Sequence, residues 1–253
     1  MTTEAPDLRT TTDTGALVKA AFERINAGEF EAARPIVERA LSLAPRAGFV
    51  AHAKVHLDSD SGNHEEGTAW MREFLTREDP FEGINKHNAW HLAFMLVALG
   101  RFDEAMEWYA RVVAPTVSAM TFNSTVQLLW RTFVLSGKRE LPWGPLREFA
   151  LGMEKEEGID RLAKATVFIA TGDNENLSEL LERLRTIDPA AEPAVGEAYV
   201  PTILGLRAFW QGDYAAAREQ LGAFGGDFGK VSPYLDHRIP LEETYRAAQE
   251  RAG

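Results

Sequence analysis

Residues 26–45 read NAGEFEAARPIVERALSLAP, and this stretch has the pattern of a helix–turn–helix unit. Gly28 stands where a chain reversal needs a residue that tolerates the left-handed backbone conformation. Small and apolar residues then recur at helical spacing, at Phe30, Ala33, Val37 and Ala40. Pro45 stands where the second helix must end, because proline cannot continue a helix. The stretch therefore predicts one helix before Gly28 and a second helix between Gly28 and Pro45.

A glycine in this setting recurs five more times along the chain. The six segments are INAGEFEAA, DSGNHEEG, VALGRFDEA, VLSGKRE, IATGDNENL and FWQGDYAAA. Their glycines are Gly28, Gly62, Gly100, Gly137, Gly172 and Gly212, with spacings of 34, 38, 37, 35 and 40 residues. The tetratricopeptide repeat, a pair of helices joined by a tight turn, has a period of about 34 residues. The pattern favours this repeat over a non-repeating helical bundle, which is the alternative.

We predict an all-α fold, a tetratricopeptide-like α-solenoid of about six helix pairs. The final stretch, HRIPLEETYRAAQERAG at residues 237–253, is typical of a capping helix with a polar outer face. We expect residues 14–253 to form a single helical-repeat domain. The polar, threonine-rich start of the chain predicts a disordered leader over residues 1–13.

Charge and composition argue against several classes of partner. The chain of 253 residues carries a formal net charge of −11, which repels phosphate, so we expect no nucleic-acid partner. It has no cysteine, which excludes disulfides, thiolate metal ligands and a cysteine nucleophile. No apolar run approaches the roughly 20 residues of a membrane helix, and the N-terminus lacks the apolar core of a signal peptide. We therefore expect a cytoplasmic protein with no membrane partner.

Four of the six histidines form two pairs with the same spacing. The pairs are His52 and His56 in AHAKVH, and His87 and His91 in KHNAWHLAF. A spacing of four places both members of a pair on one face of a helix. In the tetratricopeptide frame, counted from the turn glycines, these faces line the concave groove on neighbouring helices about 10 Å apart. We therefore predict that the two pairs meet.

The same frame gives further groove-facing residues. Aromatic side chains that could cover a ligand are Phe49, Trp90 and Phe94. Later segments add Ser124, Gln127, Arg131 and Tyr199. A guanidinium can hold a carboxylate or a phosphate through two hydrogen bonds, so Arg131 is the candidate anion anchor. The alternative interpretation keeps the histidines and Trp90 as packing residues between repeats.

The stretch from HAKVH through GNHEEGTAWM to HNAWHLAFMLVALGRFDEAMEWYARVVAP resembles the tetratricopeptide repeat protein 38 family and its bacterial relatives. Those proteins pair an H-x-x-x-H helix with an H-N-x-W-H helix, followed by a Gly-x-x-Glu/Asp-x-Ala turn. Further similarity lies in LLWR at residues 128–131 and RIPLEET at residues 238–244, and the resemblance covers residues 30–252. Departures from the family's polar positions fall at Ser124, Gln127, Leu162 or Ala163, and Ile239. The resemblance implies a helical-repeat fold and a pocket, without naming a reaction.

Histidine can both accept and donate a proton near neutral pH. We therefore predict that the groove binds a small molecule, with the four paired histidines as catalytic proton-transfer groups. The reaction would be a non-redox one of the isomerase, lyase, cyclase or hydrolase type, without a cofactor. The alternative is a protein- or peptide-binding scaffold without catalysis, which is the common use of this architecture.

A metal site is the third hypothesis. An H-x-x-x-H helix can present two imidazoles to one ion. However, no glutamate follows His52 or His87 in the H-E-x-x-H manner, and the carboxylates nearest along the chain are Asp58 and Asp60. From the sequence we therefore expect no bound metal.

Overall fold

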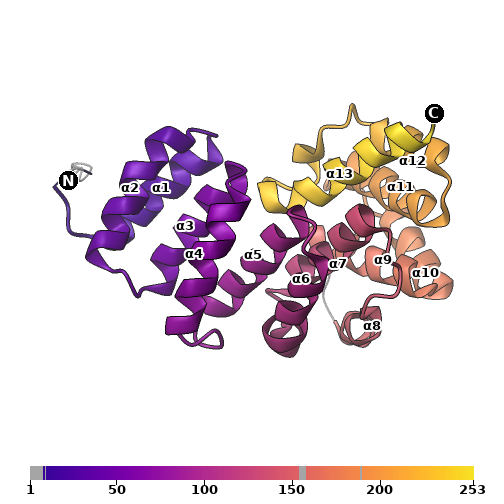
Figure 1. Cartoon of the computed structure of the whole chain (residues 1–253). Helices are drawn as coiled ribbons and strands as arrows, with labels where there is room; N and C mark the ends of the chain where they lie inside the picture. Colours follow the sequence, from indigo (N-terminus) through magenta and orange to yellow (C-terminus); the bar gives the residue numbers. More distant parts are fainter. Residues whose placement is uncertain (1–7, 9, 154–157, 189) are drawn as a thin grey trace. The chain divides into compact units, whose positions relative to one another are not determined.

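The structure is a computed structural model that describes residues 8, 10–153, 158–188 and 190–253. These residues form thirteen α-helices together with short π-helical and 3-10 turns, and no strand occurs among them. The all-α prediction is therefore confirmed (Figure 1).

The internal contacts divide the chain into two compact units, an N-terminal unit of Met1–Thr116 and a C-terminal unit of Val117–Gly253. A single repeat domain over residues 14–253 stays a prediction.

The N-terminal unit consists of three consecutive helix pairs. Its helices are α1 (Thr14–Asn26), α2 (Phe30–Leu43), α3 (Gly48–Asp60), α4 (His64–Arg77), α5 (Asn85–Ala98) and α6 (Phe102–Trp108), followed by a π-helical turn (Tyr109–Val113) and a 3-10 turn (Ala114–Thr116). Members of each pair pack on one another, and α3 also contacts α1, α2 and α5. The core between the first helices is built from Ala21, Ile25, Ala33, Val37, Ala53 and Leu57. The small residues in this set let the helices approach closely.

The C-terminal unit consists of seven further helices. They are α7 (Phe122–Ser136), α8 (Trp143–Gly152), α9 (Ile159–Thr171), α10 (Asn174–Arg185), α11 (Val200–Gln211), α12 (Tyr214–Gly222) and α13 (Leu235–Arg251). A π-helical turn, Val195–Tyr199, leads into α11, and a 3-10 turn, Phe228–Lys230, precedes α13. The last helix packs on α12 and α7, so the predicted C-terminal helix is present.

The six turn glycines have the backbone conformation that the sequence pattern requires. Their φ angles are 74° at Gly28, 80° at Gly62, 71° at Gly100, 75° at Gly137, 70° at Gly172 and 83° at Gly212. A residue with a Cβ is strained at such angles, which explains why glycine recurs there. Helix α2 ends at Leu43, two residues before Pro45, as predicted.

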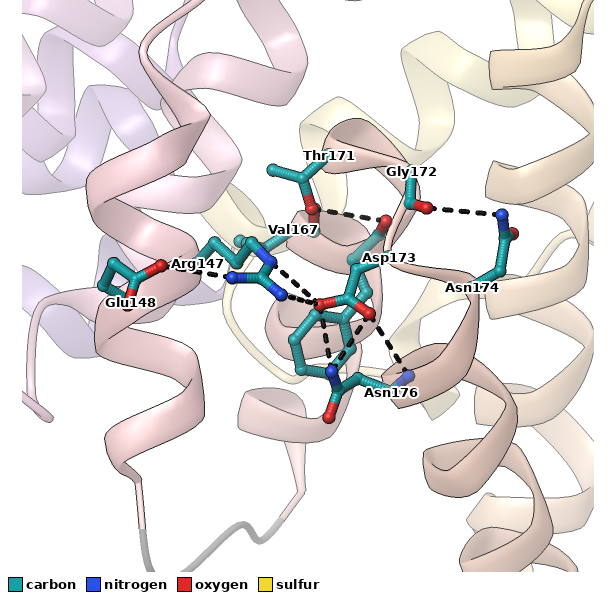
Figure 2. Close-up of polar contacts among 9 residues, drawn as sticks. Arg147, Glu148, Val167, Thr171, Gly172, Asp173, Asn174 and Asn176 are labelled. Carbon is teal, nitrogen blue, oxygen red and sulfur yellow. Dashed lines mark hydrogen bonds and ion pairs between the residues drawn. The ribbon is translucent and has the colours of Figure 1, made fainter.

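A buried carboxylate shows how one of these turns is fixed in the C-terminal unit (Figure 2). Asp173 follows Gly172 and caps α10, where its Oδ1 accepts the backbone N–H of Asn176 at 3.3 Å. Arg147 of α8 donates its Nε–H to Asp173 Oδ2 at 2.8 Å. Burial opposes ionisation of this carboxyl, but the hydrogen bonds from Asn176 and Arg147 outweigh it and hold the pKa of Asp173 below its usual value.

The start of the chain is described only in part. Of the predicted disordered leader, residues 1–7 and 9 lie outside the described residues. Within the described part, the backbone carbonyl of Thr11 accepts hydrogen bonds from Arg39, and Asp13 caps α1. Among the residues described, no helix combines the length and the apolar character needed to cross a membrane.

Candidate functional site

The two histidine pairs meet in the N-terminal unit, as predicted. The ring of His52 lies 5.0 Å from that of His87 and 5.3 Å from that of His91, between centroids. The rings of His56 and His91 are closer still, at 4.3 Å. Within each helix, the two rings lie 4.7 Å apart on α3 and 4.5 Å apart on α5. The four imidazoles therefore form one contiguous set, which we call the histidine cluster.

Two contacts near the start of α3 fix α5 against it and so place the histidines opposite one another. Asn88, which is fully buried, donates its side-chain N–H to the Gly48 carbonyl at 3.0 Å. A Cβ on Gly48 would lie only 2.5 Å from Asn85 Oδ1, so the close approach of the helices at this point requires glycine. Because these contacts set the register of α5 on α3, they also set the spacing of the two pairs.

Aromatic rings flank the cluster on both sides. Trp90 stacks on His87 with parallel planes at a centroid distance of 5.3 Å, and its ring meets that of His91 edge-on at 4.7 Å. Phe22 of α1 lies 5.4 Å from His52 and 5.2 Å from His56. His91 is buried, while His52, His56 and His87 are partly exposed. The cluster is thus enclosed by apolar rings but keeps some access to solvent.

Asp60, the last residue of α3, gives one histidine a carboxylate partner. Its Oδ2 lies 3.5 Å from His56 Nδ1, and its side chain is only 5% exposed. The other oxygen of Asp60 is buried and has no hydrogen-bond partner among the described residues. A carboxylate in this position favours the Nδ1–H tautomer of His56 and orients its ring.

His52 has the opposite electrostatic setting. Burial, and then the proximity of His56 and His87, lower the pKa of His52 from 6.5 to about 2. Its Nε2 atom is buried and has no hydrogen-bond partner within the described part of the chain. His52 is therefore a neutral imidazole at physiological pH, which suits it to be a hydrogen-bonding group or a ligand rather than a carrier of protons.

The cluster also has the donor set of a metal site. Each of the four histidines offers one ring nitrogen, and these four atoms lie within 4.8 Å of one another. His87 Nε2 and His91 Nε2 are separated by 3.1 Å.

Two of the predicted aromatic site residues have other surroundings. Phe94 is fully buried and stacks on Trp90 at 4.8 Å, so it supports the wall of the cluster from behind. Phe49 is 41% exposed and lines a cavity of about 260 Å³ together with Arg46, Glu78 and Ile84. The lining of that cavity includes no histidine among the described residues.

The remaining predicted site residues belong to the C-terminal unit, where all are buried: Ser124, Gln127, Arg131 and Tyr199. Arg131 donates from Nε and Nη2 to the carboxylate of Glu243, at 2.9 and 2.7 Å. Tyr199 donates its hydroxyl to the Val231 carbonyl at 2.9 Å, and burial raises the pKa of this hydroxyl. Arg131 as an anion anchor stays a prediction, and it requires a ligand that displaces Glu243.

Sequence reasoning did not single out Phe22 as part of the site. The signal was present, because Phe22 occupies the same position relative to Gly28 that His56 occupies relative to Gly62. Asp60 was considered only as a metal ligand, although its i, i+4 spacing from His56 on one helix predicts a contact between the two side chains.

No protein-family model matches this chain, and no curated protein matches it. The site must therefore be interpreted from its own geometry.

Proposed function

We propose that the protein binds a small molecule at the histidine cluster of the N-terminal unit. The convergence of four imidazoles from α3 and α5 carries this proposal. Such a density of nitrogen donors and acceptors, beside Trp90 and partly open to solvent, is what an orienting site for a small polar ligand requires. Trp90, which stacks on His87 and meets His91 edge-on, supports these two imidazoles from behind and fixes their orientation.

Within this site, His56 is the group we assign to proton exchange with the ligand. It is partly exposed, and Asp60 lies beside its Nδ1, the arrangement in which a carboxylate orients an imidazole and fixes its tautomer. His52 would form a hydrogen bond with the ligand as a neutral imidazole, and His87 and His91 would orient the ligand. The reaction class that fits these roles is non-redox acid–base chemistry.

The tetratricopeptide-like solenoid and the relationship to the tetratricopeptide repeat protein 38 family are part of the same proposal. The helix pairs and the left-handed turn glycines support the repeat interpretation. They are also compatible with a protein-binding scaffold, for which the exposed Phe49 and Ile84 at the 260 Å³ cavity would be the contact points.

Ligand screening by nuclear magnetic resonance tests the proposal. Small carboxylates, amines and aromatic amines would be screened against metal-free wild-type protein and against His56→Gln. The control is His64→Gln, since His64 lies on α4, is not one of the four histidines of the cluster, and has its Nε2 3.2 Å from the Ser59 carbonyl. We expect a binder whose affinity falls at least about tenfold in His56→Gln and is unchanged in the control. Equal binding to all three proteins, or to none, would contradict the proposal.

A further inference from the structure

We propose that the histidine cluster holds one divalent transition-metal ion, with a ring nitrogen from each of His52, His56, His87 and His91 as its ligands. The inference rests on the proposed function for the place of the site. In the metal-bound state His56 is a ligand, and the ion replaces it as the group that a small molecule would meet there. Formation of the metal site does not itself require that molecule.

The geometry of the cluster is close to that of a bound ion. In a tetrahedral zinc site with Zn–N bonds of about 2.0–2.1 Å, neighbouring nitrogens are separated by roughly 3.3 Å. His87 Nε2 and His91 Nε2 already lie 3.1 Å apart, and all four ligand atoms fall within 4.8 Å. Small rotations of the partly exposed rings of His52, His56 and His87 would close the remaining gap.

The helices place the ligands before any ion arrives. Each pair has the i, i+4 spacing that presents two imidazoles on one helix face, and the contacts of Asn88 and Gly48 hold α5 on α3. Four prepositioned ligands reduce the entropy that binding costs. The arrangement is therefore a built site rather than a chance gathering of surface histidines.

Unmet polar groups around the cluster point to a cation. His52 Nε2 is buried without a hydrogen-bond partner among the described residues, and a buried nitrogen lone pair is costly to leave unused.

Asp60 supplies the support that metal-bound histidines commonly have. Such a histidine usually donates its second ring N–H to a carboxylate, which fixes the tautomer and raises the basicity of the ligand nitrogen. Asp60 lies beside His56 Nδ1 in this way and leaves Nε2 for the ion. An anion at the C-terminal end of α3 is disfavoured by the helix dipole, and a divalent cation nearby would offset that cost.

The donor set selects the class of ion. Imidazole nitrogen suits zinc, copper, nickel and iron, whereas magnesium and calcium require oxygen ligands. Without a thiolate or a directly ligating carboxylate, four neutral imidazoles leave the full charge of the ion to be balanced by Asp60 and by whatever ligand binds. We therefore assign the site to a late first-row divalent ion and choose Zn²⁺ and Co²⁺ as the probes.

The test uses the full chain without an affinity tag, treated with a chelator and then dialysed. Zn²⁺ is titrated by calorimetry, and Co²⁺ by its visible absorption, which reports the coordination geometry. We expect one ion per chain with a Kd below about 1 μM.

The affinity should fall at least about tenfold in His52→Gln and in His91→Gln, because each variant loses a ligand, and it should be unchanged in His64→Gln. Circular dichroism checks that each variant is folded. If His52→Gln or His91→Gln is unfolded, His87→Gln takes its place, because His87 is partly exposed and its substitution disturbs the core less.

Wild-type protein that binds no stoichiometric ion would overturn the inference, and so would cluster variants that bind as tightly as His64→Gln. These results are separate from the small-molecule screen, which uses chelator-treated protein. A small molecule that binds without the ion, combined with no metal binding, would refute the metal site alone. Metal binding combined with no small-molecule binding, with and without Zn²⁺, would refute the proposed function alone.

Discussion

Two regions of the molecule bury polar side chains in different ways. In the C-terminal unit, the guanidinium of Arg131 is matched by the carboxylate of Glu243 through two hydrogen bonds. In the N-terminal unit, four imidazoles gather around one another, and Asp60 beside them keeps a buried oxygen without a partner among the described residues. From this difference we infer that the partners of a buried polar group, more than its residue type, indicate whether to expect a structural role or a binding role.

The largest effect we expect comes from breaking the ion pair in the C-terminal unit. Glu243→Ala removes the carboxylate that accepts hydrogen bonds from Nε and Nη2 of the buried Arg131, which should lower the free energy of unfolding by about 3–5 kcal/mol. The double variant Arg131→Met with Glu243→Met removes both charges and should recover most of the loss. Urea denaturation measures both changes. A cost below about 1 kcal/mol for Glu243→Ala would show that Arg131 does not depend on this partner, and would restore it as an anion anchor.

A second effect concerns the pH dependence of stability in the N-terminal unit, measured on metal-free protein. The pKa of His52 is about 2 in the folded protein, against the ordinary value of 6.5 that applies in the unfolded chain, so acid protonates the unfolded chain first. The contribution of the neutral His52 to the free energy of unfolding is present above pH 6.5. It is lost as the pH falls below 6.5, by up to about 2 kcal/mol between pH 6.5 and 5. His52→Gln cannot bind that proton, and its unfolding free energy should therefore depend less on pH. Parallel pH profiles for the two proteins would contradict the assignment of a neutral buried His52.

The sequence could predict the features that depend on local geometry. Glycine is required wherever the backbone must turn at positive φ, so Gly28 and its five counterparts mark the turns without any knowledge of packing. The meeting of the histidine pairs followed from the i, i+4 spacing and from the expectation that the two histidine-bearing helices are neighbours, and α3 and α5 do pack on one another.

The sequence could not predict pairings that depend on how distant helices pack. Arg131 and Glu243 are 112 residues apart, and only the packing of α13 on α7 brings them together. Phe49 lies as far before Gly62 as His87 lies before Gly100, but Phe49 lines a separate cavity with Arg46 and Glu78. A position counted from a turn glycine gives the face of a helix, but the surroundings of that face depend on side chains from other elements.

A third test compares two buried carboxylates, Asp173 and Asp60, whose side chains are 8% and 5% exposed. Asp173 caps α10 and accepts hydrogen bonds from Asn176 and Arg147, so Asp173→Ala should cost about 1–2 kcal/mol in urea denaturation (Figure 2). Asp60→Asn in metal-free protein should change stability by less than about 0.5 kcal/mol or even increase it, because a poorly paired charge is removed. Equal losses in the two variants would mean that Asp60 has a structural role like that of Asp173.

The smallest effect on stability should come from substitution of the histidines themselves. Their substitution is also the most direct test of whether the cluster has a binding role or a structural role. Glutamine keeps the polarity and the approximate size of histidine but cannot exchange a proton. If the cluster is a binding site, His56→Gln and His91→Gln should change the free energy of unfolding by less than about 0.5 kcal/mol, or one to two degrees in Tm, while binding of a ligand is lost. A histidine that belongs to the core would instead cost about 1–3 kcal/mol, because its buried hydrogen bond is removed. Thermal melts and ligand titrations on the same samples separate the two cases.

Variants that melt several degrees lower and still bind the ligand would show that the four imidazoles are packing residues. The search for a function would then move to the exposed Phe49 and Ile84 and to a protein partner.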